Sequence, residues 1–154
     1  MRVSLNVKGG ARAKRYLEAM RQAVGTATGM RVGFLENATY PAQPGRRGTL
    51  HVAQVAFFNE FGTSRAPARP FFRGMIRRDL GDWGSRFARH LRDSNFQSDR
   101  AFGLMGTEVR DALTGSIVRW PADNAPSTVA RKGFNKGLVD KGIMQRATDF
   151  EVLK

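Results

Sequence analysis

The first third of the chain changes its hydrophobic period twice. Residues 2–8 alternate between apolar and polar side chains, the pattern of a half-buried strand. From Ala11 the apolar residues recur every three or four positions instead, which predicts an amphipathic helix ending at Gly25. The apolar stripe of this helix consists of Ala13, Leu17, Met20 and Val24. Residues 30–35 alternate again and predict a second strand.

The middle of the chain predicts two helices joined by an extended segment. Apolar residues spaced three and four apart over residues 51–61 predict a short, mostly buried helix that ends at Gly62. Residues 66–70 must be extended, because a residue that precedes proline is pushed out of the helical region. A stripe over residues 72–91 then predicts a long amphipathic helix, with a kink or a close helix crossing near Gly81.

The last third predicts one more helix and a closing strand. Ser98 is suited to capping a helix whose apolar residues repeat as far as Ile117. Residues 119–142 lose this periodicity and contain the prolines and glycines that are typical of loops. Residues 148–153 alternate and predict a strand that pairs with one of the N-terminal strands.

These elements predict a single α+β domain over residues 1–154. We expect three or four helices packed on a small antiparallel sheet, with long loop arms at about 36–50 and 119–142. Because loops of this length inside a compact domain are usually either functional or disordered, both arms are candidate contact regions.

Composition narrows the class of protein. The chain has no cysteine, which excludes cysteine-dependent enzymes and zinc ribbons. No apolar run approaches the roughly 20 residues that cross a bilayer, and no signal peptide is recognisable, so we expect a soluble protein without a membrane partner. Its 26 Lys and Arg against 13 Asp and Glu give a net charge of +13, which favours nucleic acid or an acidic protein as partner.

Signatures of catalysis are nearly absent. The sequence has no phosphate-binding glycine loop, no nucleophile elbow and no zinc-binding helix motif. His51, His90 and Glu60 are the only combination that suggests a hydrolytic or metal site, and no motif surrounds them. We therefore expect no enzyme, no cofactor and no metal, and rank a small hydrolase last among the hypotheses.

Arginines recur every four residues after Gly62, at Arg65, Arg69, Arg73 and Arg77. They are interpreted either as a basic stripe for phosphates or for carboxylates of a neighbouring subunit, or as a solvated face. Arg69 lies on a stiff, proline-bounded segment and is expected at the surface, in an interface. Glu60 is expected to pair with Arg69 or with another of these arginines. The full candidate interface consists of Glu60, Arg65, Arg69, Arg73, Arg77, Trp120, Arg131 and Lys132.

Aromatic residues crowd around the same turn. Phe58, Phe61 and Phe72 follow helical apolar stripes, so packing in the core is favoured over stacking on nucleic-acid bases. Trp120 precedes Pro121 at the start of the second loop arm, where we expect it to anchor the loop in a pocket of its own chain or of a neighbour.

Two blocks of the sequence are similar to a known family. The segments Val55–Thr63 (VAFFNEFGT) and Ala66–Phe72 (APARPFF) resemble a block of the tail-completion and neck proteins of tailed bacteriophages. This group includes the lambda minor tail protein Z type and the Mu-like virion morphogenesis proteins. A second, less specific similarity covers residues 126–133 and 138–144. Lys141 stands there where the family commonly has Thr.

The resemblance implies a structural virion protein without catalysis. Such a protein forms a homo-oligomeric ring, with a hexamer expected, at the head-proximal end of a phage tail and joins tail to capsid. The implied partners are a tail terminator and a head-side connector, and non-specific contact with DNA in the channel is left open. The location is the virion tail or neck, after assembly in the host cytoplasm. The alternative hypothesis is a basic nucleic-acid-binding protein.

Overall fold

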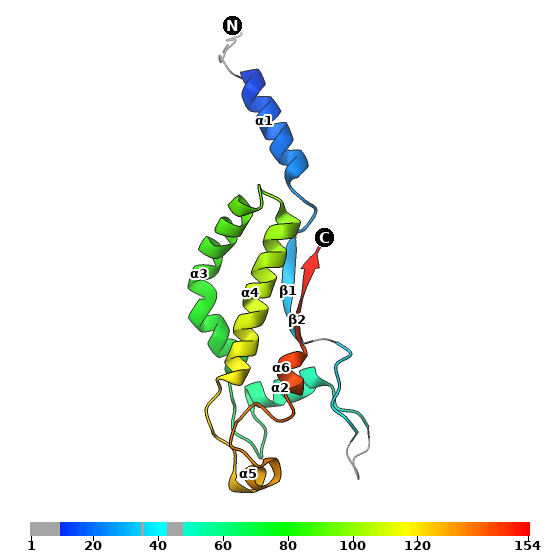
Figure 1. The fold of residues 1–154 in the computed structure, drawn as a ribbon, viewed down its shortest axis with the longest axis vertical. Helices are drawn as coiled ribbons and strands as arrows, with labels where there is room; N and C mark the ends of the chain where they lie inside the picture. The colour runs from blue at the N-terminus through cyan, green and yellow to red at the C-terminus, as the bar shows by residue number, and fades with distance from the viewer. Residues whose placement is uncertain (1–9, 35, 43–47) are drawn as a thin grey trace.

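The computed structural model describes residues 10–34, 36–42 and 48–154 and confirms the α+β class (Figure 1). The predicted strand over residues 2–8 lies outside the described residues. Six helices and two strands follow one another as α1 (Gly10–Ala23), β1 (Gly29–Phe34), α2 (Val52–Phe61), α3 (Phe71–Asp93), α4 (Ser98–Val118), α5 (Pro126–Lys132), α6 (Ile143–Arg146) and β2 (Thr148–Leu153). The described helices outnumber the three or four expected, because α5 forms within the predicted loop at 119–142 and α6 begins directly after it.

The two strands form an antiparallel sheet whose members lie far apart in the sequence. Gly29 pairs with Leu153 and Phe34 pairs with Thr148. This confirms the predicted pairing of the C-terminal strand with an N-terminal one. The face that carries Val32 and Phe150 packs against α4, whereas Arg31 and its register partner Glu151 are exposed.

Helix α4 is the centre of the domain, with α3 on one side and the sheet on the other (Figure 1). Its inward residues recur every four positions and are all buried: Ala101, Met105, Val109, Leu113 and Ile117. Phe150 of β2 lies so close to α4 that a Cβ added at Gly106 would be 2.8 Å from its Cγ. Gly106 therefore allows the sheet to approach the helix closely.

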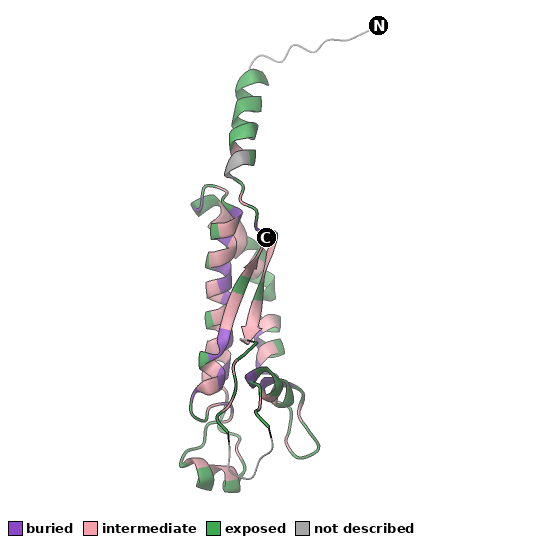
Figure 2. Cartoon of the chain, turned by 90° about the vertical axis from the view of Figure 1, so that its right-hand side faces the viewer, coloured by how far each residue is buried: buried purple, intermediate pink, exposed green. Residues whose placement is uncertain are grey.

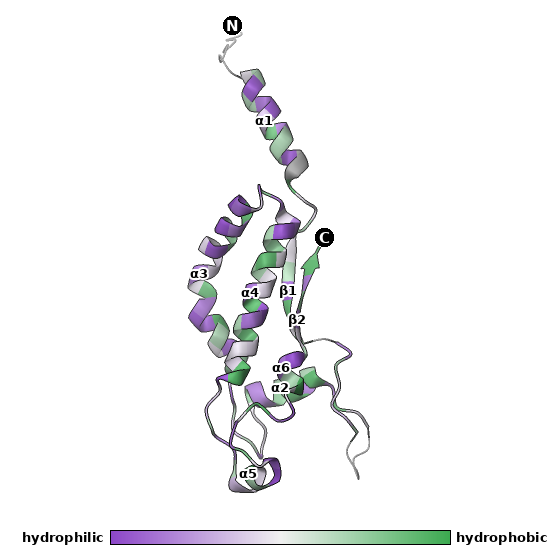
Figure 3. Cartoon of the chain, viewed as in Figure 1, coloured by the Kyte–Doolittle hydropathy of each residue, from purple (hydrophilic) through white to green (hydrophobic). Residues whose placement is uncertain are grey.

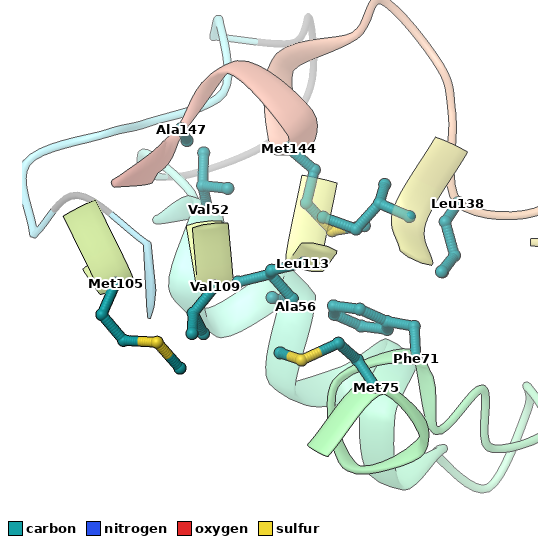
Figure 4. Packing of buried hydrophobic residues seen from close by; sticks show 11 residues of the cluster. Val52, Ala56, Phe71, Met75, Met105, Val109, Leu113, Leu138, Met144 and Ala147 are labelled. Atoms are coloured by element: carbon teal, nitrogen blue, oxygen red, sulfur yellow. The ribbon is translucent and has the colours of Figure 1, made fainter. Parts of the chain in front are cut away.

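The hydrophobic core lies between α2, α3, α4 and α6. Leu113 of α4 lies beside Ala56 of α2, and Phe71 and Met75 of α3 pack below them (Figure 4). Leu138 and Met144 complete the cluster from the C-terminal part. This core holds the N-terminus of α3 and the end of α2 in fixed positions, which matters for the candidate site.

Two local expectations are wrong. Of the two alternatives at Gly81, a kink or a close helix crossing, the crossing does not occur among the described residues, where a Cβ added at Gly81 meets no atom within 4 Å. The N-cap of α4 is Gln97 rather than Ser98, whose buried hydroxyl has no hydrogen-bond partner in the described structure.

Helix α1 stands apart from the rest of the molecule. It extends beyond the turn that joins α3 to α4, and its described side chains are exposed except for the half-buried Met20 (Figure 2). Within the described residues, no helix combines the length and hydropathy that crossing a bilayer requires.

Candidate interface at the α2–α3 turn

The turn between α2 and α3, residues 62–70, depends on a glycine. Gly62 ends α2 with φ 78° and ψ 177°, a combination that is essentially restricted to glycine. A Cβ at this position would lie 2.8 Å from the backbone nitrogen of Ala68. Thr63 and Ala66 then pair with each other, with the Thr63 N–H donating to the Ala66 carbonyl at 2.9 Å. The predicted helix end at Gly62 is confirmed.

Glu60 joins the end of α2 to the beginning of α3. This residue is only 5% exposed, and its Oε2 accepts the backbone N–H of Phe72 at 2.9 Å. Its Oε1 accepts both the backbone N–H of Arg73 at 3.1 Å and the Arg73 Nε at 2.8 Å. The first turn of α3 contains no acidic residue, so Glu60 supplies the negative charge that a helix N-terminus favours. Its arginine partner is thus Arg73, not Arg69.

Arg69 is mostly buried, with a side chain 12% exposed, which corrects the expectation that it lies at the surface. Its Nε donates to Oδ2 of Asp123 at 2.7 Å and its Nη1 donates to Oδ1 of Asn59 at 3.1 Å. The Arg69 backbone N–H also donates to the Asn59 carbonyl at 2.6 Å. Arg69 therefore connects the end of α2, the extended turn and the segment that follows α4.

Trp120 and Asp123 anchor that segment to the chain itself. The Trp120 Nε1 donates to Oδ2 of Asp123 at 3.1 Å, and the ring packs against the edge of the core. Residues 119–142 are therefore not an unstructured arm: they contain α5, and the Asn124 N–H donates to Oδ1 of Asn135 at 3.1 Å. The sequence leaves open whether Trp120 anchors the loop in its own chain or in a neighbour. In the structure Trp120 packs within its own chain.

The pKa of Asp123 lies below its ordinary value of 3.8. Burial raises this pKa, but hydrogen bonds from Arg69 and Trp120, together with the charge of Arg69, outweigh burial. A carboxylate whose pKa is lowered by folding stabilises the fold above its unfolded pKa and loses that effect as the pH falls through its folded pKa.

Asp123→Asn should therefore lower the free energy of unfolding by about 1 kcal/mol at pH 7, and the difference from the parent chain should shrink below about pH 4. Urea denaturation at pH 7 and pH 3 measures both values. Asp111→Asn is the matched control, because within the described residues Asp111 pairs with the adjacent Arg110 alone and its side chain is well exposed. An equal effect of the two substitutions at pH 7 would contradict the anchoring role of Asp123.

A cavity of about 660 Å³ lies beside the turn and collects half of the predicted interface residues. Four cationic residues line it, namely Arg65, Arg69, Arg131 and Lys132, together with the acids Asp123 and Asp140. Burial lowers the pKa of Lys132. The charge of Asp140 raises this pKa, whereas the charges of Arg131 and Arg69 lower it further. The remaining predicted residues lie elsewhere: Glu60 and Arg73 at the start of α3, Arg77 on its exposed face, and Trp120 against the core.

The phenylalanines of α2 lie outside the core. Phe57, Phe58 and Phe61 are 58%, 42% and 52% exposed, and we refer to these three residues as the phenylalanine surface. The prediction that Phe58 and Phe61 are core residues is therefore wrong, whereas Phe72 does pack against the core. The buried positions of α2 are Val52, Ala56 and Glu60, four residues apart, so the inward face ends in a carboxylate.

The three residues considered for a hydrolytic or metal site are not brought together. Glu60 binds the first turn of α3, whereas His90 lies 18 residues further along the helix, about 27 Å away, and contacts Glu108 of α4 at 2.9 Å. Within the described residues, no group of three or more histidines and carboxylates could hold a metal ion.

Sequence reasoning missed Asp123 and the phenylalanine surface. Asp123 is the only carboxylate between Asp111 and Asp140, a signal that could have drawn attention to it beside several arginines. Comparisons of the chain with models of protein families, with curated proteins and with solved structures found no match.

Proposed function

We propose that the chain is a structural virion protein that forms a ring at the head-proximal end of a phage tail and joins tail to capsid. One observation carries the proposal: the sequence block that resembles the tail-completion family forms a single rigid connection between α2 and α3. Gly62 makes the turn, Glu60 binds the start of α3, and Arg69 attaches the turn to Asn59.

The bonding of this block suits a structural role better than a catalytic one. The two carboxylate oxygens of Glu60 accept three hydrogen bonds, so the group is already engaged and buried. The guanidinium of Arg69 is likewise occupied by Asp123 and Asn59. A side chain held in this way fixes backbone geometry and is poorly placed to bind a substrate or to exchange a proton with it.

The net charge of +13 constrains what such a ring contacts. Identical basic chains placed side by side repel one another, so acidic groups must offset the charge nearby. Exposed arginines such as Arg65, Arg77 and Arg131 are available for this purpose. Because a guanidinium pairs with a carboxylate through two parallel hydrogen bonds, we favour acidic faces of the neighbouring tail and head proteins over DNA as the main partner.

The test locates the chain in virions. Immunogold labelling of purified particles of the phage that encodes the chain should place it between head and tail, and raised salt should release it from isolated tails. Native mass spectrometry of the released assembly should give one copy number, with six expected. A chain that is absent from the particles would contradict the proposal.

A titration of duplex DNA onto the free chain distinguishes the proposed virion protein from the alternative, a nucleic-acid-binding protein. We expect only weak, sequence-independent binding that falls steeply between about 50 and 200 mM salt, as for any basic surface. Tight binding by the monomer, with Arg77→Ala reducing affinity but Asp111→Asn leaving it unchanged, would instead favour a nucleic-acid-binding protein.

A further inference from the structure

Helix α1 has an apolar face without a partner in the described chain. Tyr16 and Leu17 are each 64% exposed, although Leu17 lies on the same stripe as Ala13 and Met20. An isolated helix of 14 residues is marginal in water, because helical stability in proteins comes mostly from packing of the apolar face. The exposed apolar face of α1 therefore lacks, within the described chain, the packing that usually stabilises a helix of this length.

The connection of α1 to the domain places this helix beyond one end of the molecule (Figure 1). The Thr26 N–H donates to Oδ2 of Asp99 at 3.0 Å, and the Thr28 N–H donates to the Leu153 carbonyl at 2.8 Å. Both bonds hold the connection at the end of the molecule where α3 turns into α4, opposite α2 and α5 (Figure 1). The nearby outer face of the sheet carries Arg31 and Glu151 and offers α1 no apolar strip.

A second unpartnered apolar feature lies at the other end of the domain. A shallow groove of about 250 Å³ runs between α2, the end of β1 and the start of α3. Its walls are almost entirely apolar and include Phe34, Ala53, Phe57, Phe61 and Phe72. The rings of Phe57 and Phe61 lie 4.6 Å apart and form one continuous side of it. Figure 3 shows α2 as a mostly apolar helix at this end of the molecule, away from α1.

We propose that the Tyr16–Leu17–Met20 face of α1 in one copy docks in this groove on a second copy. The inference rests on the proposed assembly of several copies and names the two surfaces that it uses. Because the two surfaces are different and lie at opposite ends of the chain, the contact is heterologous, and its repetition gives a ring when the rotation between successive copies closes.

Size and charge both fit this occupant. Covering three half-exposed aromatic rings, those of Tyr16, Phe57 and Phe61, removes on the order of 300 Å² from water, which suits the apolar centre of a specific interface. Helix α1 carries Arg12, Lys14, Arg15 and Arg21 against one acid, Glu18. Asp149 stands opposite Gly33 of the groove wall, and Glu36 follows Phe34 by two residues, so two carboxylates lie near the groove. Arg73 also lines the groove, and its charge is paired with Glu60.

The absence of cysteine in the chain allows a direct test. Leu17→Cys and an affinity-tagged Phe57→Cys are prepared separately, mixed at about 0.5 M salt to screen the charges, and oxidised. We expect a mixed disulfide dimer in at least tenfold greater yield than from Arg15→Cys mixed with the same Phe57→Cys chain. Arg15 lies on the opposite face of α1 and serves as the matched control.

A second measurement covers assembly itself. Leu17→Asp should weaken self-association at least tenfold by light scattering, whereas Leu104→Asp on the exposed side of α4 should not. Equal disulfide yields for the Leu17→Cys and Arg15→Cys mixtures, or unchanged assembly of Leu17→Asp, would overturn the docking. If immunogold labelling still located the parent chain between head and tail, either result would contradict the docking but not the proposed ring. A parent chain that remains monomeric and is absent from virions would overturn both proposals.

Discussion

Glu60→Gln should lower the free energy of unfolding by about 3 kcal/mol. The glutamine keeps one oxygen acceptor but places an NH₂ group where Oε1 or Oε2 of the carboxylate now accepts. At least one of the Phe72 and Arg73 backbone N–H groups then faces another donor in a buried site. The negative charge at the N-terminus of α3 is lost in the same step. Equilibrium denaturation in urea, followed by circular dichroism, measures the change.

Asp82→Asn provides the matched control for Glu60→Gln. It removes the same charge, but Asp82 is exposed and pairs with Arg86 at 3.5 Å within one helix. An exposed pair of this kind contributes little to stability, so the free energy of unfolding should change by less than about 0.5 kcal/mol. If both variants lost the same stability, the effect would come from net charge and not from the bonds to α3.

Gly62→Ala should destabilise the protein by a similar amount, about 3 kcal/mol. Alanine must adopt φ 78° with ψ 177°, and its Cβ would meet the Ala68 nitrogen at 2.8 Å and the Ala66 oxygen at 3.1 Å. Both obstacles are backbone atoms of a turn that Arg69 and the Thr63–Ala66 pairing hold in place, so neither can rotate away. Thermal and urea denaturation measure the loss.

Gly133→Ala separates the strain of a positive φ from the contact that the added Cβ makes with the turn. Gly133 also has a positive φ, 79°, but with ψ near 0°, and an added Cβ there meets no described atom within 4 Å. Only the strain of a left-handed alanine remains, and we expect a cost of about 1 kcal/mol. An equal cost at both positions would show that the contact with the turn is unimportant.

The order and type of the main elements could be predicted from sequence because their apolar periods are long and regular. The stripe through Met105, Val109, Leu113 and Ile117 is the buried face of α4 in the structure. The alternating segment at 148–153 pairs with residues 29–34, the second of the two N-terminal strands that the sequence predicts at 2–8 and 30–35. One face of α4 is buried along most of its length and the inward face of the sheet is partly buried, so in both cases the pattern reflects the environment.

The candidate site is less predictable because its contacts are decided by residues distant in the sequence. The sequence predicts Arg69 at the surface, but Asp123, 54 residues later, reaches it and covers it. In α2 the apolar pattern predicts that the phenylalanines are buried. The buried face of the structure carries Val52, Ala56 and Glu60 instead. A helix of ten residues with apolar side chains on most sides has no single face that periodicity can identify. Helix α5 escapes prediction because seven residues are too few to show a period.

The separation of the two paired strands has a consequence for synthesis of the protein. Phe34 and its register partner Thr148 are 148 − 34 = 114 residues apart. At the usual elongation rates of about 5–20 residues per second, β1 waits roughly 6 to 23 s before its partner is translated. During this interval the edge of β1 has no strand partner, and we expect the yield of the protein to depend on the speed of the ribosome along the second half of the message.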